Sequence, residues 1–367
     1  MAKVGHLPMF NYPKRLFSRL KRELEQAGIS PRFQPFEFHQ SNQIGSDLSI
    51  LIVAAGSVKI PTQGWGAVET IIAETIPEFL ANGVSVGLLN SQNFVEWKKA
   101  SRNRYDVIVC HSDSHLEKVR KHWSATPLVA ITHYGLAAQP NIWHPSFNKV
   151  FTSISKADKI VCLSPAILET FSSLIPSEQL VQFGNGSEFV SKPCVEKSDV
   201  IVMVGKVEER KRQYELWQYA MNNKISIHFI GPIEDSRVLK HLKRDRDLAR
   251  YFKGPKNRNE LATELPQYKA LALLSDGEAD ALVLYEAQFA GLEIITNKAS
   301  LGNQESGLPW IHIAGGFEDL KKVISKISSN PFDPAVIGAY ANSNYRWNIR
   351  LMPLIHLVRE LTLNEKR

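Results

Sequence analysis

The chain has 367 residues, 44% of them hydrophobic and 22% charged, which indicates a globular protein of about two domains, each with its own core. No apolar run approaches the roughly 18 residues of a membrane span, and the N-terminus lacks the apolar segment of a signal peptide, so we expect a cytoplasmic protein. The 44 Lys and Arg residues exceed the 37 Asp and Glu residues, and the resulting charge of +7 favours anionic partners. Zinc-finger spacing and basic-aromatic RNA-binding motifs are absent, so nucleic acid is not an expected partner.

The three cysteines, Cys110, Cys162 and Cys194, are far apart, and two of them lie in apolar, strand-like runs. Neither a disulfide framework nor a zinc site explains this distribution. We therefore expect reduced, buried thiols.

Residues 1–48 form an N-terminal extension before the first clear strand. Within it, residues 12–27 have helical periodicity, with Leu and Phe residues on one face, five Lys and Arg residues around them, and Gly28 at the end. This helix packs either on the adjacent domain or on an anionic membrane surface, and the second case would make the protein peripheral at the inner face of a membrane. Residues 31–38, rich in Phe and Pro, are expected to run extended along a surface.

Strands and helices alternate from residue 49 to residue 190. Residues 49–55, SILIVAA, are a continuous apolar run typical of a buried parallel strand, and residues 67–81 have helical periodicity. Further strands are expected at 84–90, 106–110, 128–132 and 160–163, with helical segments between them. The pattern predicts one Rossmann-like, doubly wound α/β domain over residues 49–190.

Two glycines, Gly64 and Gly66, lie between the first strand and the first helix of this domain. A dinucleotide-binding fingerprint would need a third glycine where Glu69 stands, and a shorter loop, so we reject a dehydrogenase. Glycines ahead of a helix let a phosphate or sugar approach the backbone and the helix N-terminus. A plain glycine turn that enters the helix is the alternative.

Histidines follow two of the predicted strands. Residues 111–115, HSDSH, look like a metal cluster, but alternating side chains would point apart and no Cys or Glu completes a set, so we expect no metal site. His133 ends the apolar strand at 128–132 and precedes Tyr134 and Gly135. A lone histidine at a strand end is often structural.

A polar, Pro-containing segment at residues 191–198 is typical of an interdomain linker. The alternating pattern then restarts, and we predict a second Rossmann-like domain over residues 197–340. Its first strands are expected at 200–204, 225–231 and 251–254.

A basic loop follows the first strand of this second domain. Gly205 is followed by Lys206, and Lys211 comes five positions later. Two fixed cations stabilise the negative charge that a diphosphate leaving group gains, without a metal. The alternative is a solvated basic loop. The Asp245–Asp247 segment, DRD, lies in a charged, helix-like run and is interpreted as surface.

Residues 271–297 read as a strand, a turn, a helix and a second strand, with Gly291 ending the helix. Glu278 lies in the turn and Glu286 in the helix, with seven residues between them. Ligands bind at the carboxyl ends of the strands in open α/β sheets, where a helix N-terminus offers free N–H groups to an anion. A nucleoside diphosphate fits both demands. Two more amphipathic helices are predicted at 317–327 and 345–361.

These motifs together resemble the retaining family-4 glycosyltransferases of the GT-B fold. The resemblance rests on five features in the family's order, namely the loop with Gly64 and Gly66, His133, the Asn185-Gly186 turn, Lys206 with Lys211, and the E-x7-E pair Glu278 and Glu286. It implies two Rossmann-like domains that face each other across a cleft, with residues 341–367 forming a helix that crosses back to the first domain.

The resemblance also implies roles for these residues. Glu278 would face the donor sugar, Glu286 would hold the ribose hydroxyls, and the N–H groups near Leu282 and Val283 would stabilise the diphosphate with Lys206 and Lys211. His133 would lie near the transferred sugar. The implied activity is retaining, metal-independent transfer from a UDP-sugar or GDP-sugar to a glycan or lipid-linked acceptor, as in surface polysaccharide synthesis, with no cofactor.

One departure from the family is the sequence Ala279-Asp280-Ala281 in place of Gly-Phe-Gly, which adds a carboxylate and removes backbone freedom near the diphosphate. A catalytically silent GT-B scaffold that binds a nucleotide-sugar or glycan is therefore an open alternative. A GT-B epimerase or phosphorylase is another.

Overall fold

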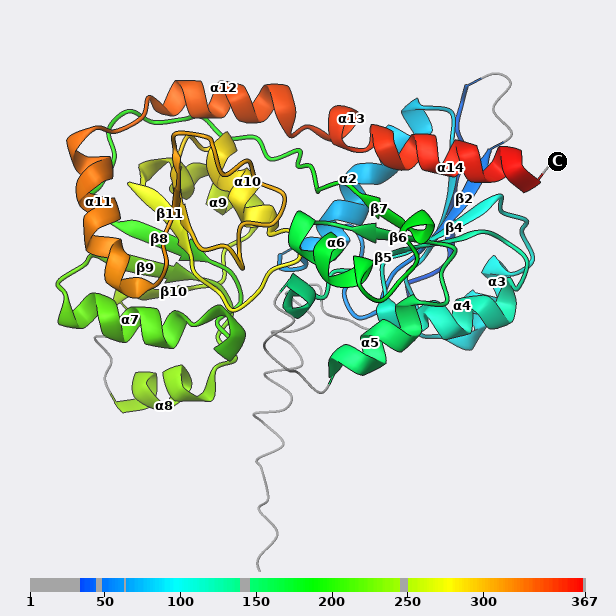
Figure 1. Ribbon diagram of the computed structural model, residues 1–367, viewed down its shortest axis with the longest axis horizontal. Helices are drawn as coiled ribbons and strands as arrows, with labels where there is room; N and C mark the ends of the chain where they lie inside the picture. Colours follow the sequence, from blue (N-terminus) through cyan, green and yellow to red (C-terminus); the bar gives the residue numbers. More distant parts are fainter. Residues whose placement is uncertain (1–33, 44–47, 63, 139–145, 245–249, 366–367) are drawn as a thin grey trace, which may run out of the picture.

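The computed structural model describes residues 34–43, 48–62, 64–138, 146–244 and 250–365, which form two α/β lobes side by side (Figure 1). The helix predicted at residues 12–27 and the Asp245–Asp247 segment lie outside the described residues. Within the described part of the chain, no helix is long and apolar enough to cross a membrane.

The first lobe is built on a seven-stranded sheet with the order β1-β3-β2-β4-β5-β6-β7. Its strands are β1 (Glu37–His39), β2 (Ser49–Val53), β3 (Ser85–Leu89), β4 (Val107–Cys110), β5 (Leu128–Ile131), β6 (Lys159–Cys162) and β7 (Leu180–Gln182). Neighbouring strands from β3 to β7 pair in parallel. The continuous apolar runs that predicted these strands are buried on both faces by helices.

The first lobe's helices include α2 (Ala67–Ala81), α3 (Phe94–Ala100), α4 (Leu116–His122), α5 (Ser146–Ile154) and α6 (Pro165–Ser172). The segment expected to run extended along the surface ends in β1, which pairs antiparallel with β3. Ser41, just after β1, donates from its backbone N to Ser85 Oγ at 3.1 Å and from its Oγ to the carbonyl of Leu80 at 2.9 Å. These bonds fix the segment as an edge strand.

The second lobe contains six parallel strands in the order β10-β9-β8-β11-β12-β13. They are β8 (Ile201–Val204), β9 (Ile227–Ile230), β10 (Phe252–Gly254), β11 (Ala270–Leu273), β12 (Glu293–Thr296) and β13 (Ile311–Ile313). The helices are α7 (Gln213–Asn222), α8 (Ser236–Arg244), α9 (Arg258–Glu264), α10 (Leu282–Phe289), α11 (Leu320–Ser329) and α12 (Pro334–Asn344). The prediction of two doubly wound α/β sheets is confirmed.

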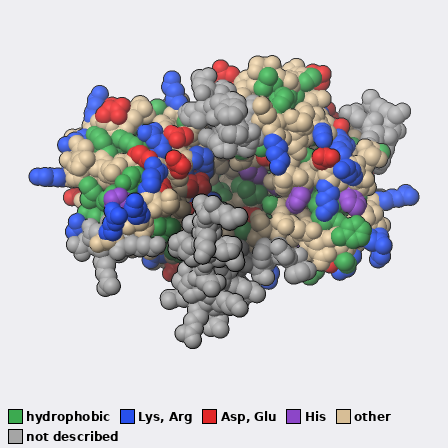
Figure 2. Space-filling view, turned by 90° about the horizontal axis from the view of Figure 1, so that it is seen from below, with side chains coloured by type: hydrophobic (Ala, Val, Ile, Leu, Met, Phe, Trp, Pro, Cys, Tyr) green, Lys and Arg blue, Asp and Glu red, His purple; other side chains and the backbone are tan. Residues whose placement is uncertain are grey.

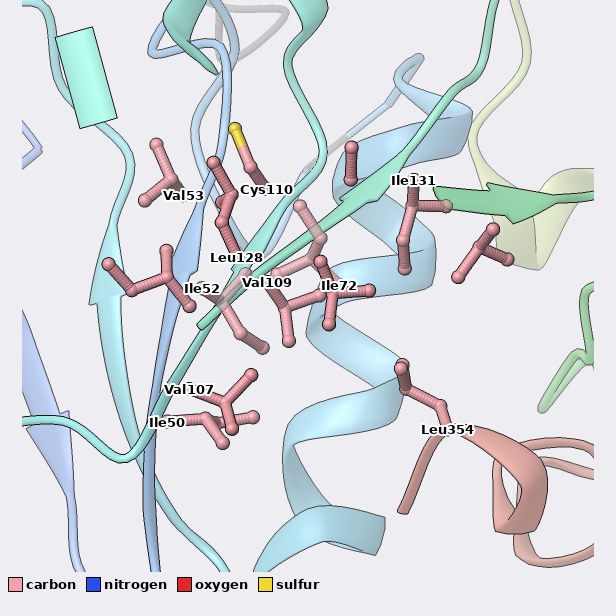
Figure 3. Close-up of a cluster of buried hydrophobic side chains, with 14 of the residues drawn as sticks. Ile50, Ile52, Val53, Ile72, Val107, Val109, Cys110, Leu128, Ile131 and Leu354 are labelled. Atoms are coloured by element: carbon pink, nitrogen blue, oxygen red, sulfur yellow. The ribbon is translucent and has the colours of Figure 1, made fainter. Parts of the chain in front are cut away.

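The C-terminal segment runs from the second lobe to the first as α12, α13 (Trp347–Arg350) and α14 (Met352–Glu365) (Figure 1). The single helix predicted at 345–361 is wrong in its bounds, because the chain breaks at Leu351, just before Pro353, which has no N–H to donate. The apolar side of the predicted helix, with Trp347, Leu351, Ile355 and Val358, is nevertheless buried in the core of the first lobe. Leu354 lies in the same core, near Ile72 (Figure 3).

Candidate active site between the two lobes

The strand order of each sheet reverses direction at one point. The loops after β2, β8 and β11, which carry most of the predicted site residues, start at these points, whereas His133 follows β5. In the first lobe this point lies between β2 and β4, and in the second between β8 and β11. Crevices at the carboxyl ends of strands at such points bind ligands in open α/β sheets. Acidic and basic side chains mix on the flank of the second lobe that faces the gap between the lobes (Figure 2).

Glu278, in the loop after β11, is buried and paired with two cations. Its Oε1 lies 2.8 Å from Lys211 Nζ and 3.1 Å from the guanidinium of Arg210. Burial alone would raise the pKa of Glu278, but Lys211 and Arg210 outweigh it and hold the pKa below its ordinary value. The carboxylate is therefore ionised at neutral pH.

Gly205 brings Lys211 close to the end of β8. Its φ is +151°, and a Cβ at this position would lie 3.3 Å from Lys211 Nζ. A side chain there would be strained and would crowd the ammonium group. Lys211 belongs to the single-turn helix η4 (Glu209–Lys211), which follows this glycine.

Lys206 does not join this cluster in the structure. Its Nζ lies 3.0 Å from Glu208 and 3.1 Å from Glu234, and its side chain is 41% exposed. The sequence predicted equal roles for Lys206 and Lys211, but only Lys211 is paired with Glu278.

Glu286, the second glutamate of the pair, is buried on α10. Its carboxylate lies 3.3 Å from Nε of Arg258, which also bonds to Glu74 of α2 and, at 2.7 Å, to Ser187 Oγ. Burial raises the pKa of Glu286 above its ordinary value. The positive charge of Arg258 lowers this pKa, and the negative charge of Glu74 raises it further. Glu286 is thus one of two carboxylates that share one arginine.

Helix α10 begins close to both glutamates. Its N-cap, Ala281, supplies no side-chain cap, so the first N–H groups, at Leu282 and Val283, lack intrahelical acceptors. Such N–H groups and the helix dipole favour an anion at this end.

Asp280 does not place a carboxylate at this helix end in the way expected from the sequence. One oxygen accepts hydrogen bonds from the backbone N of Asn185 and from Tyr285 Oη, both at 2.7 Å, and the other accepts one from the backbone N of Asn303 at 3.0 Å. Burial raises the pKa of Asp280 to about 6. Because every oxygen is occupied, Asp280 ties its loop to its neighbours.

His133 lies at the end of β5 and pairs with His111, which follows β4. The two rings are stacked, with His111 Nδ1 3.1 Å from His133 Nε2. Burial lowers the pKa of both, to about 4 for His133, so both are neutral at pH 7. Among the described residues, no cluster of three or more His, Cys, Asp or Glu side chains is placed to hold a metal.

Gly135 brings the first lobe into contact with the loop of Glu278. A Cβ on Gly135 would lie 2.7 Å from the carbonyl oxygen of Gly277 and 3.0 Å from Cα of Glu278. The two lobes therefore meet at this glycine.

The loop with Gly64 and Gly66 enters α2. Gly66 has a φ of +140°, and a Cβ there would lie 2.8 Å from Oε2 of Glu69, so the turn requires glycine. Trp65, between the two glycines, packs against the core of the second lobe. The structure thus places this loop at the interface of the lobes.

Sequence reasoning missed Arg210, Arg258 and Glu74. Arg210 precedes Lys211 in the basic loop but has no role in the predicted site, and Glu74 is distant in sequence from both Arg258 and Glu286. No pattern in one sequence pairs residues over such separations.

Comparison with known proteins finds the same architecture at low sequence identity. A sucrose-phosphate synthase from Thermosynechococcus elongatus superposes with a TM-score of 0.69 and 14% identity, over 86% of this chain and 100% of that chain. Anabaena HepE in complex with UDP-glucose superposes with a TM-score of 0.62 and 15% identity, over 87% of this chain and 100% of that chain. AviGT4, a glycosyltransferase involved in avilamycin A biosynthesis, superposes with a TM-score of 0.60 and 13% identity, over 86% of this chain and 98% of that chain.

No protein-family model and no curated protein sequence matches the chain. The superpositions cover both lobes of this chain and nearly all of the three matched chains. The chain has the GT-B fold, as the sequence predicted.

Proposed function

We propose that this protein is a retaining glycosyltransferase that moves a sugar from a UDP-sugar or GDP-sugar to a glycan or lipid-linked acceptor. The observation that carries the proposal is Glu278, a buried carboxylate held by Lys211 and Arg210 beside the N-terminus of α10. Cations and free N–H groups suit a diphosphate, and an ionised carboxylate suits sugar hydroxyls. The GT-B fold and the UDP-glucose bound to HepE support this assignment.

In this proposal the donor spans the second lobe. Glu286 accepts hydrogen bonds from the ribose hydroxyls, the first N–H groups of α10 and Lys211 contact the diphosphate, and Glu278 faces the sugar. As the glycosidic bond breaks, negative charge grows on the diphosphate, so cations fixed beforehand stabilise the transition state more than the ground state. The departing phosphate oxygen takes the acceptor's proton in a front-side mechanism.

The first lobe supplies the acceptor side. His133, neutral because it is buried, offers a ring nitrogen for hydrogen bonding rather than a charge. Gly64 and Gly66 line the same interface. A role in surface polysaccharide synthesis stays a prediction. Binding to an anionic membrane also stays a prediction, because the basic helix at 12–27 lies outside the described residues.

Turnover separates an enzyme from a silent scaffold. We expect one nucleoside diphosphate sugar from a panel of UDP-sugars and GDP-sugars to raise the melting temperature and then to be converted to free nucleotide. NMR of the product should show the anomeric configuration of the donor. Stabilisation without any turnover in the presence of acceptor glycans would favour the scaffold, and no stabilisation by any donor would contradict the proposal.

A further inference from the structure

Arg258 contacts Glu74 of the first lobe and Glu286 of the second at the same time. We propose that Arg258 is a positioning residue, which keeps the carboxylate of Glu286 charged and in place for the hydroxyl groups of a ligand, and that Glu74 holds Arg258 there. This inference rests on the proposed function, since it concerns the ribose half of the same site.

The carboxylate of Glu286 is buried, but its oxygens are not used by the protein. Nε of Arg258 lies 3.3 Å from one oxygen, and no other cation among the described residues lies within 4.0 Å. This contact is not aligned as a hydrogen bond, and no described residue donates one to the carboxylate. Glu278, by contrast, accepts a hydrogen bond from Lys211 at 2.8 Å. Buried acceptors are normally satisfied, so the oxygens of Glu286 suit donors that arrive with a ligand.

Arg258 is fixed through both of its terminal nitrogens. Nη1 donates to Glu74, and Nη2 donates to Ser187 Oγ at 2.7 Å. The centre of the guanidinium lies 5.4 Å from the centre of the Phe189 ring, within the range of a cation–π contact. Because both terminal nitrogens are occupied, the guanidinium presents Nε to Glu286.

The backbone of Arg258 is fixed as well, because Arg258 is the first residue of α9. The side chain of Asn257, the N-cap, accepts from the backbone N of Glu260 at 3.0 Å, and the side chain of Glu260 accepts from the backbone N of Asn257 at 2.7 Å. This capping box defines where α9 starts. The guanidinium therefore projects from a helix end of defined geometry.

Glu74 is held by the segments that connect the lobes. Its Oε2 accepts from the backbone N of Glu188 at 3.0 Å and from Nε1 of Trp347 at 2.9 Å, which leaves Oε1 for Arg258. Arg258 is thus anchored to the first lobe by a carboxylate that is itself fixed.

Two charged side chains of the described residues face Glu286, namely Arg258 from α9 and Glu74 from α2. Helix α12, which packs on α10, carries Tyr340 as its titratable side chain and no charged one. Glu293, at the start of β12, has its own partner on β13. The charge of Glu286 therefore depends on one cation and one carboxylate.

These two groups act on the proton affinity of Glu286 in opposite directions. Burial raises the pKa of Glu286, Arg258 lowers it, and Glu74 raises it further. Without Arg258 the carboxyl group would take up a proton at a higher pH and lose its charge-assisted hydrogen bonds to hydroxyl groups. Without the charge of Glu74 it would stay ionised to a lower pH. An arginine with a merely structural role would not give this pair of opposite effects.

Nucleotide binding measured by calorimetry at pH 5, 6, 7 and 8 tests the inference. UDP and 2′,3′-dideoxy-UDP are titrated into the parent protein and into Arg258→Gln, Arg258→Lys and Glu74→Gln, with GDP and its dideoxy form in parallel. The ratio of the two affinities at each pH isolates the ribose hydroxyl groups from the titration of the phosphates. Arg250→Gln is the control, because it removes an exposed arginine of the same lobe that lies 4.8 Å from the Tyr251 ring. Melting temperatures verify folding.

We expect the hydroxyl contribution to affinity in Arg258→Gln to be about tenfold smaller than in the parent at pH 6 and to recover as pH rises to 8. Arg258→Lys should follow the profile of the parent, because an ammonium group keeps the charge. Glu74→Gln should retain the contribution to a lower pH than the parent does, and Arg250→Gln should match the parent.

Parallel profiles of the parent and Arg258→Gln, or an equal loss for UDP and its dideoxy form, would overturn this inference alone. If Arg258→Gln does not fold, the Glu74→Gln profile decides, and a profile equal to that of the parent or displaced to higher pH would overturn the inference. A parent protein that binds UDP and dideoxy-UDP equally well would refute the ribose role of Glu286. A parent that binds no nucleoside diphosphate would refute the proposed function, and this inference with it.

Discussion

At the scale of single residues, Glu286 is a buried carboxylate whose charge is compensated by one arginine. It is buried, and its cation, Arg258, is shared with Glu74 on the other lobe. Burial raises its pKa above the ordinary value, so its charge is maintained at a cost. Hydrogen bonds from ligand hydroxyl groups therefore stabilise this buried carboxylate more than they would stabilise one already in contact with water.

Glu286→Gln should weaken nucleoside diphosphate binding about tenfold or more, because a neutral amide replaces charge-assisted hydrogen bonds to two hydroxyls. Calorimetry with UDP and GDP measures the change. Glu318→Gln, an exposed glutamate in the same lobe, is the control. An affinity equal to that of the parent would remove Glu286 from the site.

At the scale of elements, the loop that joins β11 to α10 is held in place by Asp280. Its carboxylate accepts the backbone N–H groups of Asn185 and Asn303 and the hydroxyl of Tyr285. Burial raises its pKa to about 6, whereas an unfolded aspartate titrates near about 3.9. Between these values the folded protein holds a proton that the unfolded chain has released.

Asp280 should therefore contribute a pH dependence to stability. Its contribution is fully present below about pH 4 and is lost as pH rises through 6, with a span of at most about 3 kcal/mol for a shift of about two units. Urea unfolding of the parent and of Asp280→Asn at pH 4.5, 6 and 7.5 measures it. The parent should lose stability relative to the variant as pH rises, and parallel profiles would contradict the assignment.

Most elements could be predicted from the sequence, because buried parallel strands are continuous apolar runs and helices show their own period. Of the four described edge strands of three residues, β10 was predicted and β1, β7 and β13 were not, because three residues are too few to show a periodicity. Glu278, Lys211 and Glu286 were proposed as site residues through the resemblance of their spacing to a family pattern, and the structure brings Glu278 and Lys211 together. Arg258 and Glu74 are 184 residues apart and meet only in the folded molecule.

At the scale of the whole molecule, the described part of the chain passes between the lobes twice, and the two crossings lie side by side. The backbone N of Ser187 donates to the carbonyl of Tyr345 at 2.8 Å, and the backbone N of Trp347 donates to Glu188 at 2.9 Å. The indole N–H of Trp347 donates to Glu74 at 2.9 Å. Trp347 therefore fastens the second crossing to both the first crossing and the first lobe.

Trp347→Ala should destabilise the protein by about 3 to 5 kcal/mol, because it removes a large side chain buried in the core of the first lobe. Thermal and urea unfolding measure the loss. Val336→Ala, at a half-exposed position on α12, should change stability by less than about 0.5 kcal/mol. Equal stability of the two variants would show that the crossing does not anchor the first lobe.

Two adjacent crossings act as a pivot, because any rotation that parts the lobes must turn about the line where the chain passes between them. Arg258 bonds to both Glu74 and Ser187 near this line, and it lies 3.3 Å from the carboxylate of Glu286. A rotation about this axis would displace atoms least close to it, so Glu286 and Arg258 would keep their contact while the lobes moved. Gly135 and Gly277, which meet across the lobes beside the proposed sugar position, would part in such a rotation. A donor would thus be captured by its nucleotide first, and its sugar would be enclosed second.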